Sequence, residues 1–274
     1  MNSKNKTGNQ GKLLILSTII IIICAVISYC VMESNTGNAQ NNIIYSTDAN
    51  IKNYADAKET VSEYADKHGL SMDDYPESLI ELLGRNSETK DFVLSYPKEK
   101  DKKHKVNLKE YKNCNSVPLF MQWDKRWGYI LYGDDVAGLT GCGPVCLSMA
   151  AVYVLQDTKY SPDYMLEWAK ENGYCVAGSG SLWTLISEGG EKLGLDVTEI
   201  PLDKQRIINN LEVGNPIICV MGPGVFTSTG HFIVMTGYEN GKIKINDPNS
   251  YANSQKAWDY EDIYDQINNL WVIR

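Results

Sequence analysis

The 274-residue sequence is poor in histidine and contains no CxxC motif. Its only histidines are His68, His104 and His231, which disfavours any mechanism or metal centre built on a cluster of imidazoles. The seven cysteines include no CxxC pair, the spacing typical of structural zinc sites. We therefore expect no bound metal and no other cofactor.

Basic residues are also in deficit, with 26 Lys and Arg against 34 Asp and Glu and a net charge of −8. Proteins that bind nucleic acid neutralise phosphates with a basic face, so this balance argues against a nucleic-acid partner. The charge is unevenly distributed. Residues 1–32 carry three lysines and no acid, whereas residues 33–274 carry 23 basic and 34 acidic residues, a net −11. An acidic body of this kind suits solubility outside a cell.

One long apolar run stands near the N-terminus. Leu13–Met32 is 20 residues without a charge, preceded by three lysines. That length spans a hydrocarbon core as a helix, and the basic flank is expected to stay in the cytoplasm. We predict a basic cytoplasmic tail at residues 1–12 and a transmembrane signal anchor at 13–32. The alternative is a cleaved signal peptide with secretion of the remainder, since Gly37-Asn38-Ala39 fits a small-x-small cleavage site.

The rest of the chain divides by composition. Residues 33–47 are polar and rich in Asn, and are predicted to form a tether. Residues 48–97 show helical patterns, residues 98–116 form a Lys-rich linker, and residues 117–274 have the composition of a compact domain. The lysines of the linker are interpreted as a solvated surface rather than as an interaction patch.

The helical segment 48–97 is predicted to hold three helices. Apolar residues over Ile51–His68 recur at three- and four-residue spacing, and Gly69 should end that helix. Pro76 is expected to open a second short helix. Ser87 is expected to cap a third, which should end at Pro97.

The compact region 117–274 changes from helical to strand patterns along the chain. After a buried helix that follows Gly143-Pro144, further helices are predicted at Pro162–Asn172, Leu182–Leu193 and Lys204–Leu211. Strands are then predicted at Ile217–Val220, His231–Tyr238, Lys242–Asn246 and from Trp271 to the end, with a hairpin turn at Glu239-Asn240-Gly241. Helices followed by antiparallel strands predict an α+β domain.

A reactive thiol is predicted where Gly141-Cys142-Gly143-Pro144 runs into the apolar helix. Pro144 suits the first helical position, so Cys142 should lie at a helix N-terminus, where the helix dipole favours a thiolate. The flanking glycines leave room for a substrate backbone to approach and allow tight turning. The alternative is a small residue packed at a turn, since cysteine is often buried and inert.

His231 is the only histidine in 117–274, and it begins a predicted strand. A neutral imidazole with a pKa of about 6.5 could take the thiol proton and later give it to a leaving amine. The alternative is a solvent-facing histidine after a flexible loop. His68 and His104 are expected to be structural or surface residues, because one lies on a helix face and the other in the Lys-rich run.

Asp247 is the candidate partner of the histidine. Period-two alternation places Asp247 on the inward face with Ile243 and Ile245, while Asn246 is expected to point toward solvent. An inward carboxylate on the neighbouring strand is well placed to accept the imidazole N–H. The alternative is an Asp that starts a turn before Pro248.

Two further groups of side chains are less specific. The amide of Gln122 could point toward a developing oxyanion beside the backbone N–H of Cys142. A disulfide from Cys142 to Cys146 would have awkward geometry within one helix, so Cys146 is expected to face the core. The remaining thiols, Cys114, Cys175 and Cys219, are expected to be structural or unpaired.

Four sequence blocks, VPLFMQWDKRWG, GCGPVCLSMA, GHFIVMTGY and INDPNS, resemble the stand-alone members of the bacteriocin-leader-processing peptidase family. These are bacterial papain-like cysteine peptidases with their functional residues in the order Gln, Cys, His, Asp. The resemblance runs from about Val117 to the C-terminus. It implies a papain-like fold with Cys142 as nucleophile, His231 as base, Asp247 as the acid that orients the base and Gln122 as oxyanion-hole donor.

Residues 76–97 also resemble an N-terminal segment of secreted members of this branch. The chain holds no ATP-binding cassette, and its single apolar segment is not a transporter domain. Cleavage of a double-glycine leader during export is therefore not implied.

Together these features predict an extracytoplasmic cysteine peptidase that hydrolyses peptide bonds through an acyl-enzyme. Its expected partners are a peptide or protein substrate and the membrane, through residues 13–32. Two alternatives stay open. One is a non-catalytic cell-surface module that binds peptides on the same fold. The other is a cysteine amidase or transpeptidase that acts on cell-wall peptides.

Overall fold

The computed structural model describes residues 45–274 of the chain. The predicted cytoplasmic tail, the transmembrane segment Leu13–Met32 and most of the tether lie outside the described residues. Among the helices of residues 45–274, none combines the length and the apolar character needed to cross a bilayer.

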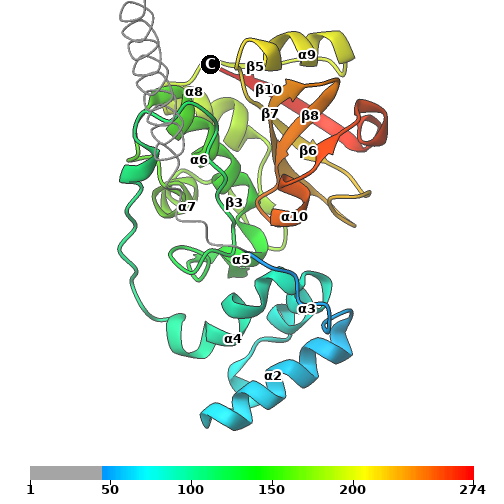
Figure 1. Cartoon of the computed structure of the whole chain (residues 1–274). Coiled ribbons are helices and arrows are strands. Elements are labelled where there is room, and N and C mark those ends of the chain that lie inside the picture. The colour runs from blue at the N-terminus through cyan, green and yellow to red at the C-terminus, as the bar shows by residue number, and fades with distance from the viewer. Residues whose placement is uncertain (1–44) are drawn as a thin grey trace, which may run out of the picture. The chain divides into compact units, whose positions relative to one another are not determined.

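A six-stranded antiparallel sheet occupies the C-terminal part of the chain, in the order β5-β10-β6-β7-β8-β9 (Figure 1). Its strands are β5 (Val197–Glu199), β6 (Ile217–Met221), β7 (His231–Glu239), β8 (Lys242–Asn246), β9 (Ala257–Trp258) and β10 (Ile267–Ile273). Two separate hairpins are formed by β1 (Leu131–Tyr132) with β2 (Asp135–Val136) and by β3 (Cys175–Val176) with β4 (Gly180–Ser181).

Helices lie on two sides of this sheet, and the N-terminal helices of the described chain form a separate group beside it (Figure 1). The α-helices are α2 (Tyr54–His68), α3 (Glu77–Arg85), α4 (Lys90–Glu99), α5 (Ala137–Thr140), α6 (Cys142–Leu155), α7 (Pro162–Glu171), α8 (Gly190–Lys192), α9 (Lys204–Glu212) and α10 (Tyr251–Ser254). Short 3-10 turns lie at Met72–Asp74, Ser87–Thr89, Lys109–Tyr111, Tyr260–Asp262 and Tyr264–Gln266.

The predicted hairpin between β7 and β8 is confirmed. Asn240 and Gly241 have φ values of 55° and 81°, the two successive positive values that a tight type I′ turn requires. Strand β8 has its predicted bounds, whereas β10 begins four residues before the predicted start at Trp271. Strands β5 and β9 are too short for a periodic signal and were not predicted.

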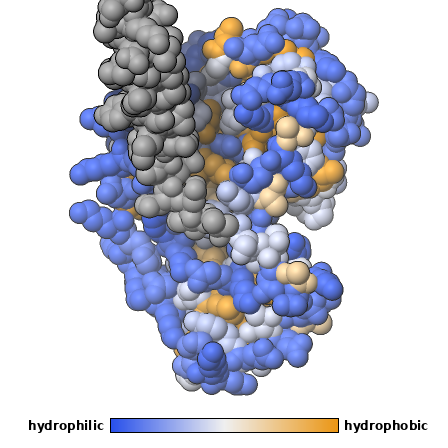
Figure 2. Space-filling view, in the orientation of Figure 1, coloured by the Kyte–Doolittle hydropathy of each residue, from blue (hydrophilic) through white to orange (hydrophobic). Residues whose placement is uncertain are grey.

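Both faces of the sheet are covered. Side chains of Ile218 and Val234 pack into one apolar core with α6, while those of Ile217 and Ile245 pack into another with α9. As a result all five residues of β6 are buried. The face of the molecule seen in Figure 2 is mainly hydrophilic, with small hydrophobic patches.

This two-sided cover corrects one prediction. Asn246 does not point freely to solvent, because its Nδ2 donates to the carbonyl oxygens of Val117 (3.2 Å) and Pro118 (3.0 Å). The prediction assumed that one side of β8 faces water. At the Asn246 end of that strand, the side opposite Ile245 lies against the chain segment that leads to α6.

The predicted helix at Leu182–Leu193 is also wrong at its start. The backbone N–H of Leu182 donates to the carbonyl of Tyr174 (2.9 Å), which extends the β3–β4 pairing by one residue. A π-helical turn then runs over Leu185–Gly189 and leads into α8.

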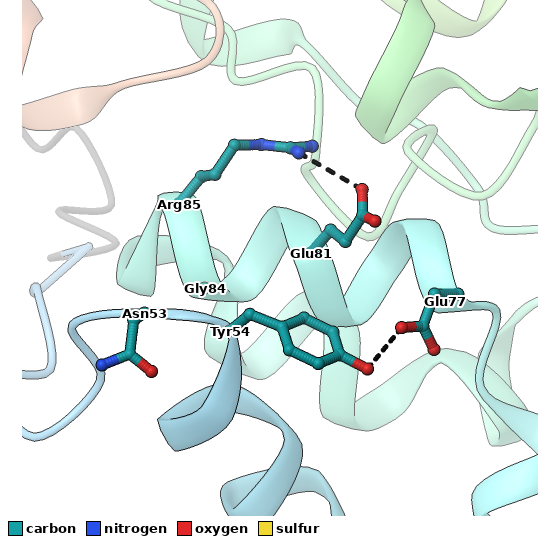
Figure 3. Close-up of a pocket in the computed structure, with 6 residues that line it drawn as sticks. All are labelled: Asn53, Tyr54, Glu77, Glu81, Gly84 and Arg85. Carbon is teal, nitrogen blue, oxygen red and sulfur yellow. Dashed lines mark hydrogen bonds and ion pairs between the residues drawn. The ribbon is translucent and has the colours of Figure 1, made fainter.

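In the helical segment, α2 ends at Gly69 as predicted, with a left-handed φ of 64°. A Cβ added at Gly84 of α3 would lie 2.8 Å from the backbone of Tyr54, so only glycine allows α3 to approach the start of α2 this closely. A surface pocket of about 360 Å³ opens beside this crossing (Figure 3). Its charged groups are occupied: Arg85 pairs with Glu81 at 3.3 Å, and the Tyr54 hydroxyl donates to Glu77.

The third predicted helix differs in its cap and its end. Asn86, rather than Ser87, caps the turn, since its side chain accepts from the backbone N–H of Glu88 (3.0 Å). The hydroxyl of Ser87 instead accepts from the N–H of Asp48 (3.0 Å). Helix α4 continues past Pro97 and ends at Glu99, with the proline in its last turn.

The helical segment shares an apolar core with residues of the predicted peptidase region. The ring of Phe92 stacks on Tyr129 with centroids 4.5 Å apart, and the Tyr129 hydroxyl donates to the Phe92 carbonyl (2.7 Å). A Cβ at Gly138 would lie 2.5 Å from this ring. Residues 45–274 accordingly form one compact unit, which begins at Tyr45 inside the predicted tether.

Candidate active site

Cys142 is the first residue of α6, as the sequence predicts, with Gly141 as N-cap. Helix α6 is buried from Gly143 to Val152, so Cys142 is attached to a rigid helix. Pro144 stands at the third helical position rather than the first. This position is still inside the turn where amide hydrogens have no helical partner, so the proline fits.

The glycines beside Cys142 serve one of the two roles predicted for them. A Cβ at Gly141 would lie 2.7 Å from the carbonyl oxygen of Ala137, and one at Gly143 would lie 2.8 Å from the hydroxyl of Ser181. Both positions are filled by the protein's own neighbours, α5 and β4. The glycines therefore allow tight packing around the start of α6, as predicted, whereas the space that each side chain would take is filled by Ala137 and Ser181 rather than left for a substrate backbone.

His231 and Asp247 lie together. Nε2 of His231 is 2.8 Å from Oδ1 of Asp247, and the two residues are 7% and 1% exposed. His231 begins β7, and Asp247 follows the last residue of β8, which pairs with that strand. The carboxylate can only accept here, so Nε2 carries the proton of this hydrogen bond and Nδ1 is left to face another group.

The thiol of Cys142 interacts with the imidazole of His231. Burial acts to raise the pKa of Cys142, but the hydrogen bond and the charge of His231, with the backbone N–H groups of Phe232 and Gly143, lower it further than burial raises it. The net pKa of Cys142 is below that of an ordinary cysteine.

The pKa of His231 moves in the opposite direction. Burial lowers it, but the charge and hydrogen bond of Asp247 and the interaction with Cys142 raise it to about 10. Both directions favour the pair of thiolate and imidazolium over the pair of neutral groups. The pKa of His231 differs from the value of about 6.5 assumed from the sequence, because the buried Asp247 stabilises the charged ring.

Asp247 has partners at both carboxylate oxygens. Oδ1 also accepts from the backbone N–H of Asn249 (2.9 Å), and Oδ2 accepts from Nδ2 of Asn253 (2.9 Å). Its own N–H donates to the hydroxyl of Ser254 (2.9 Å). Asp247 thus starts a turn and also holds the histidine, so both predicted interpretations apply. Asn253 and Ser254 lie on α10, and no local motif in the sequence identified them.

Gln122 is buried near the same turn. Its backbone N–H donates to the carbonyl of Pro248 (2.8 Å), the residue after Asp247. Its Nε2 donates to the carbonyl of Gly138 (2.9 Å), which fixes the direction of the amide because a carbonyl cannot face another carbonyl there. Oε1 is buried and has no partner within residues 45–274.

The other two histidines lie apart from this group. The His68 ring stacks on Tyr64 at 3.9 Å, and Nε2 of His104 lies 3.4 Å from Glu99. All five cysteines of the described chain are free thiols, and Cys146 and Cys219 are fully buried. Nowhere in residues 45–274 do three or more His, Cys, Asp or Glu side chains form a group that could hold a metal ion.

Residues 114–272 match the model of the family described as Peptidase_C39 like. The chain belongs to the Peptidase_C39 like family. This agrees with the family resemblance carried by the sequence blocks, and with a mixed helix-and-sheet peptidase fold.

Two solved structures are similar to the chain at a low level. One is the peptidase domain of Streptococcus ComA, a bifunctional ABC transporter involved in quorum sensing. It is 19% identical, with a TM-score of 0.40, over 57% of this chain and 96% of that domain. The other, from Bacillus anthracis, is described as a C39-like peptidase and is 14% identical, with a TM-score of 0.39, over 58% of this chain and 94% of its own. No curated protein matches the chain.

The ion pair predicts an unusual pH dependence for alkylation by iodoacetamide. Because the pKa of Cys142 is lowered, its thiolate should persist below the pH at which ordinary cysteines lose reactivity. In His231→Ala the imidazolium is lost while Cys142 stays buried, so the pKa of Cys142 should rise. Alkylation of Cys142 at pH 7 should then slow by about tenfold for each unit of increase.

Mass spectrometry of the peptide that carries Cys142 measures this rate in the native protein. Cys146 and Cys219 are internal controls, since burial raises the pKa of both thiols and both should stay unmodified. An equal rate at pH 7 in wild type and His231→Ala would contradict the ion pair.

Proposed function

We propose that the chain is an extracytoplasmic cysteine peptidase that hydrolyses peptide bonds through Cys142, His231 and Asp247. Membership of the Peptidase_C39 like family supports the peptidase class. The observation that carries the proposal is the 2.8 Å hydrogen bond from His231 to Asp247, beside a thiol whose pKa is lowered by that same histidine.

In the proposed reaction, the Cys142 thiolate attacks the carbonyl carbon of the scissile bond and the carbonyl oxygen becomes an oxyanion. The imidazolium of His231 then gives its Nδ1 proton to the leaving amine as the C–N bond breaks. This leaves a thioester on Cys142 and a neutral imidazole. A water molecule gives a proton to His231 as its oxygen attacks the thioester, which releases the acid product and regenerates the ion pair.

Asp247 supports both steps without taking a proton. Its hydrogen bond holds Nε2–H, so Nδ1 stays directed to the thiol, and its charge stabilises the imidazolium. The proposed oxyanion donors are the backbone N–H of Cys142 and an N–H of Gln122 Nε2. The Gly138 carbonyl takes one of the two hydrogens of that amide and keeps the nitrogen in place.

The first test is loss of the nucleophile. Cys142→Ala should abolish hydrolysis of a fluorogenic peptide library by the full chain and leave its thermal unfolding unchanged, because one sulfur atom is removed at the end of a helix. Cys114→Ala is the matched control, since that half-buried thiol lies outside the group around His231 and should keep full activity. Persistent hydrolysis by Cys142→Ala would exclude the mechanism.

The same assay with an added amine separates hydrolysis from acyl transfer. A peptidase releases a free acid at every amine concentration, whereas a transpeptidase yields the amide. If the amide is the dominant product, the enzyme is a transpeptidase rather than a peptidase. A reactive Cys142 without any turnover would favour the peptide-binding module.

The oxyanion role of Gln122 has its own test. Gln122→Ala should lower kcat by about 10²–10³, the usual effect of removing one oxyanion donor, with a smaller change in KM. Gln156→Ala is the control, because that exposed amide only donates to the backbone carbonyls of Cys114 and Tyr153. An unchanged kcat with the fold intact would remove Gln122 from the mechanism.

The extracytoplasmic placement rests on the apolar run at residues 13–32 and its basic flank. When the full chain is expressed in bacteria, it should remain in carbonate-washed membranes, with residues 45–274 open to protease added from outside. Deletion of 13–32 should release it to the soluble fraction. Recovery of the intact full chain in the cytosol would contradict this placement.

A further inference from the structure

A buried carboxylate from the helical segment contacts the turn that carries Asp247. Glu88 lies between α3 and α4 and is only 6% exposed. Its Oε2 accepts from the backbone N–H of Tyr251 and its Oε1 from that of Ala252, both at 2.8 Å. These are the first two residues of α10, more than 160 positions further along the chain.

Helix α10 in turn holds Asp247. Asn253 donates from Nδ2 to Oδ2 of Asp247 (2.9 Å), and the hydroxyl of Ser254 accepts the Asp247 N–H (2.9 Å). A short chain of hydrogen bonds therefore runs from Glu88 through α10 to Asp247 and on to His231. A four-residue helix is too short to be stable alone, so its position depends on such contacts.

The neighbouring residues fix the other side of the turn. Nδ2 of Asn86 donates to the carbonyl of Asn249 (2.6 Å), and the indole N–H of Trp123 donates to the same oxygen (3.0 Å). The ring of Tyr45 packs edge-on against both Trp123 and Tyr251. The segment thus contacts the turn at Asn249 through Asn86 and the start of α10 through Glu88.

The contact has an energetic cost. Burial raises the pKa of Glu88, and the nearby charge of Asp247 raises it further, although the two amide donors offset part of this. The charge of Asp247 acts on Glu88, and within residues 45–274 the hydrogen-bond partners of Glu88 include no basic side chain. An apolar side chain at position 88 would avoid this repulsion, but it could not accept the two N–H groups of α10.

We propose that Glu88 is a positioning residue for the triad, which makes the helical segment 48–97 a working part of the active site. Its carboxylate holds α10, α10 holds Asp247, and Asp247 holds the imidazole at the angle needed by Cys142. The kinetic part of this proposal rests on the proposed peptidase function, while the thiol chemistry does not.

The experiment compares the full chain with Glu88→Ala, Glu88→Gln and Glu81→Gln. Glu81 is the matched control, since it is an exposed carboxylate of α3 in the same segment and pairs only with Arg85. Three quantities are measured: the pH dependence of Cys142 alkylation by iodoacetamide, kcat and KM for a peptide substrate, and thermal unfolding.

Glu88→Ala should shift the pH midpoint of Cys142 alkylation upward, because a loosened Asp247 stabilises the imidazolium less. It should also lower kcat by about tenfold to a hundredfold with KM little changed, the range expected for displacement of a catalytic group by about 1 Å. Glu88→Gln keeps one acceptor oxygen and should give a shift in the same direction but smaller. Glu81→Gln should match wild type in all three quantities.

A folded Glu88→Ala protein with the wild-type alkylation profile would overturn the proposal. If Glu88→Ala does not fold, the isosteric Glu88→Gln decides in the same way. Cys142, Cys146 and Glu88 are ionisable groups that interact with the Asp247–His231 pair. Cys146 is unchanged in every variant, so a shift reports the loss of Glu88. A wild-type chain that hydrolyses no peptide would refute the proposed function, and the alkylation profiles would still decide the role of Glu88.

Discussion

The hydrogen bond between His231 and Asp247 is the interaction on which the candidate site depends. It fixes which imidazole nitrogen carries the shared proton, and both partners are buried, so loss of either would leave a charge without its counterpart. The bond in turn depends on strand register, because Val234 pairs with Asn246 and so brings the end of β8 beside the start of β7. A slip of one residue would turn Asp247 to the other face of the sheet. The five residues of β8 separate the tight turn at Asn240-Gly241 from Asp247, about 17 Å at a rise of ~3.4 Å per residue, so this distant turn matters to the chemistry.

Three cysteines whose pKa burial acts to raise allow the effect of burial on a thiol pKa to be separated from the effect of the ion pair. Cys146 and Cys219 are fully buried, no imidazole acts on them, and burial raises the pKa of both. Cys142 is also penalised by burial, yet its pKa falls because His231 stands beside it. The sequence predicts a reactive thiol at this position from the helix N-terminus. The amide of Gly143 in the first turn does lower this pKa, but it contributes less than the histidine.

Local patterns predicted the parts of the site that depend on neighbouring residues in the chain. Helical spacing and a glycine stop found α2, alternation found β8 and the inward position of Asp247, and a Gly-Cys-Gly-Pro run found the start of α6. Contacts between distant segments left no such signal. The glycines beside Cys142 are required by Ala137 and Ser181, and Asn253 reaches Asp247 only because α10 folds back over the turn. The side of β8 that α6 and its preceding segment cover could not be inferred from β8 alone.

The helical segment is joined to the rest of the unit by contacts of two different kinds. Phe92 fits against Gly138 and stacks on Tyr129, and burying such a ring contributes about 1.5–3 kcal/mol, so the apolar contact by itself favours docking. The contact at Glu88 does not add stability in the same way, because it places a second carboxylate close to Asp247 and its pKa is raised. Glu88 contributes directional contacts, because its carboxylate accepts hydrogen bonds from two amides of α10. The apolar contact of Phe92 has no such directional preference. Apolar packing fixes where the segment docks, and the carboxylate fixes the position of the short helix that holds Asp247.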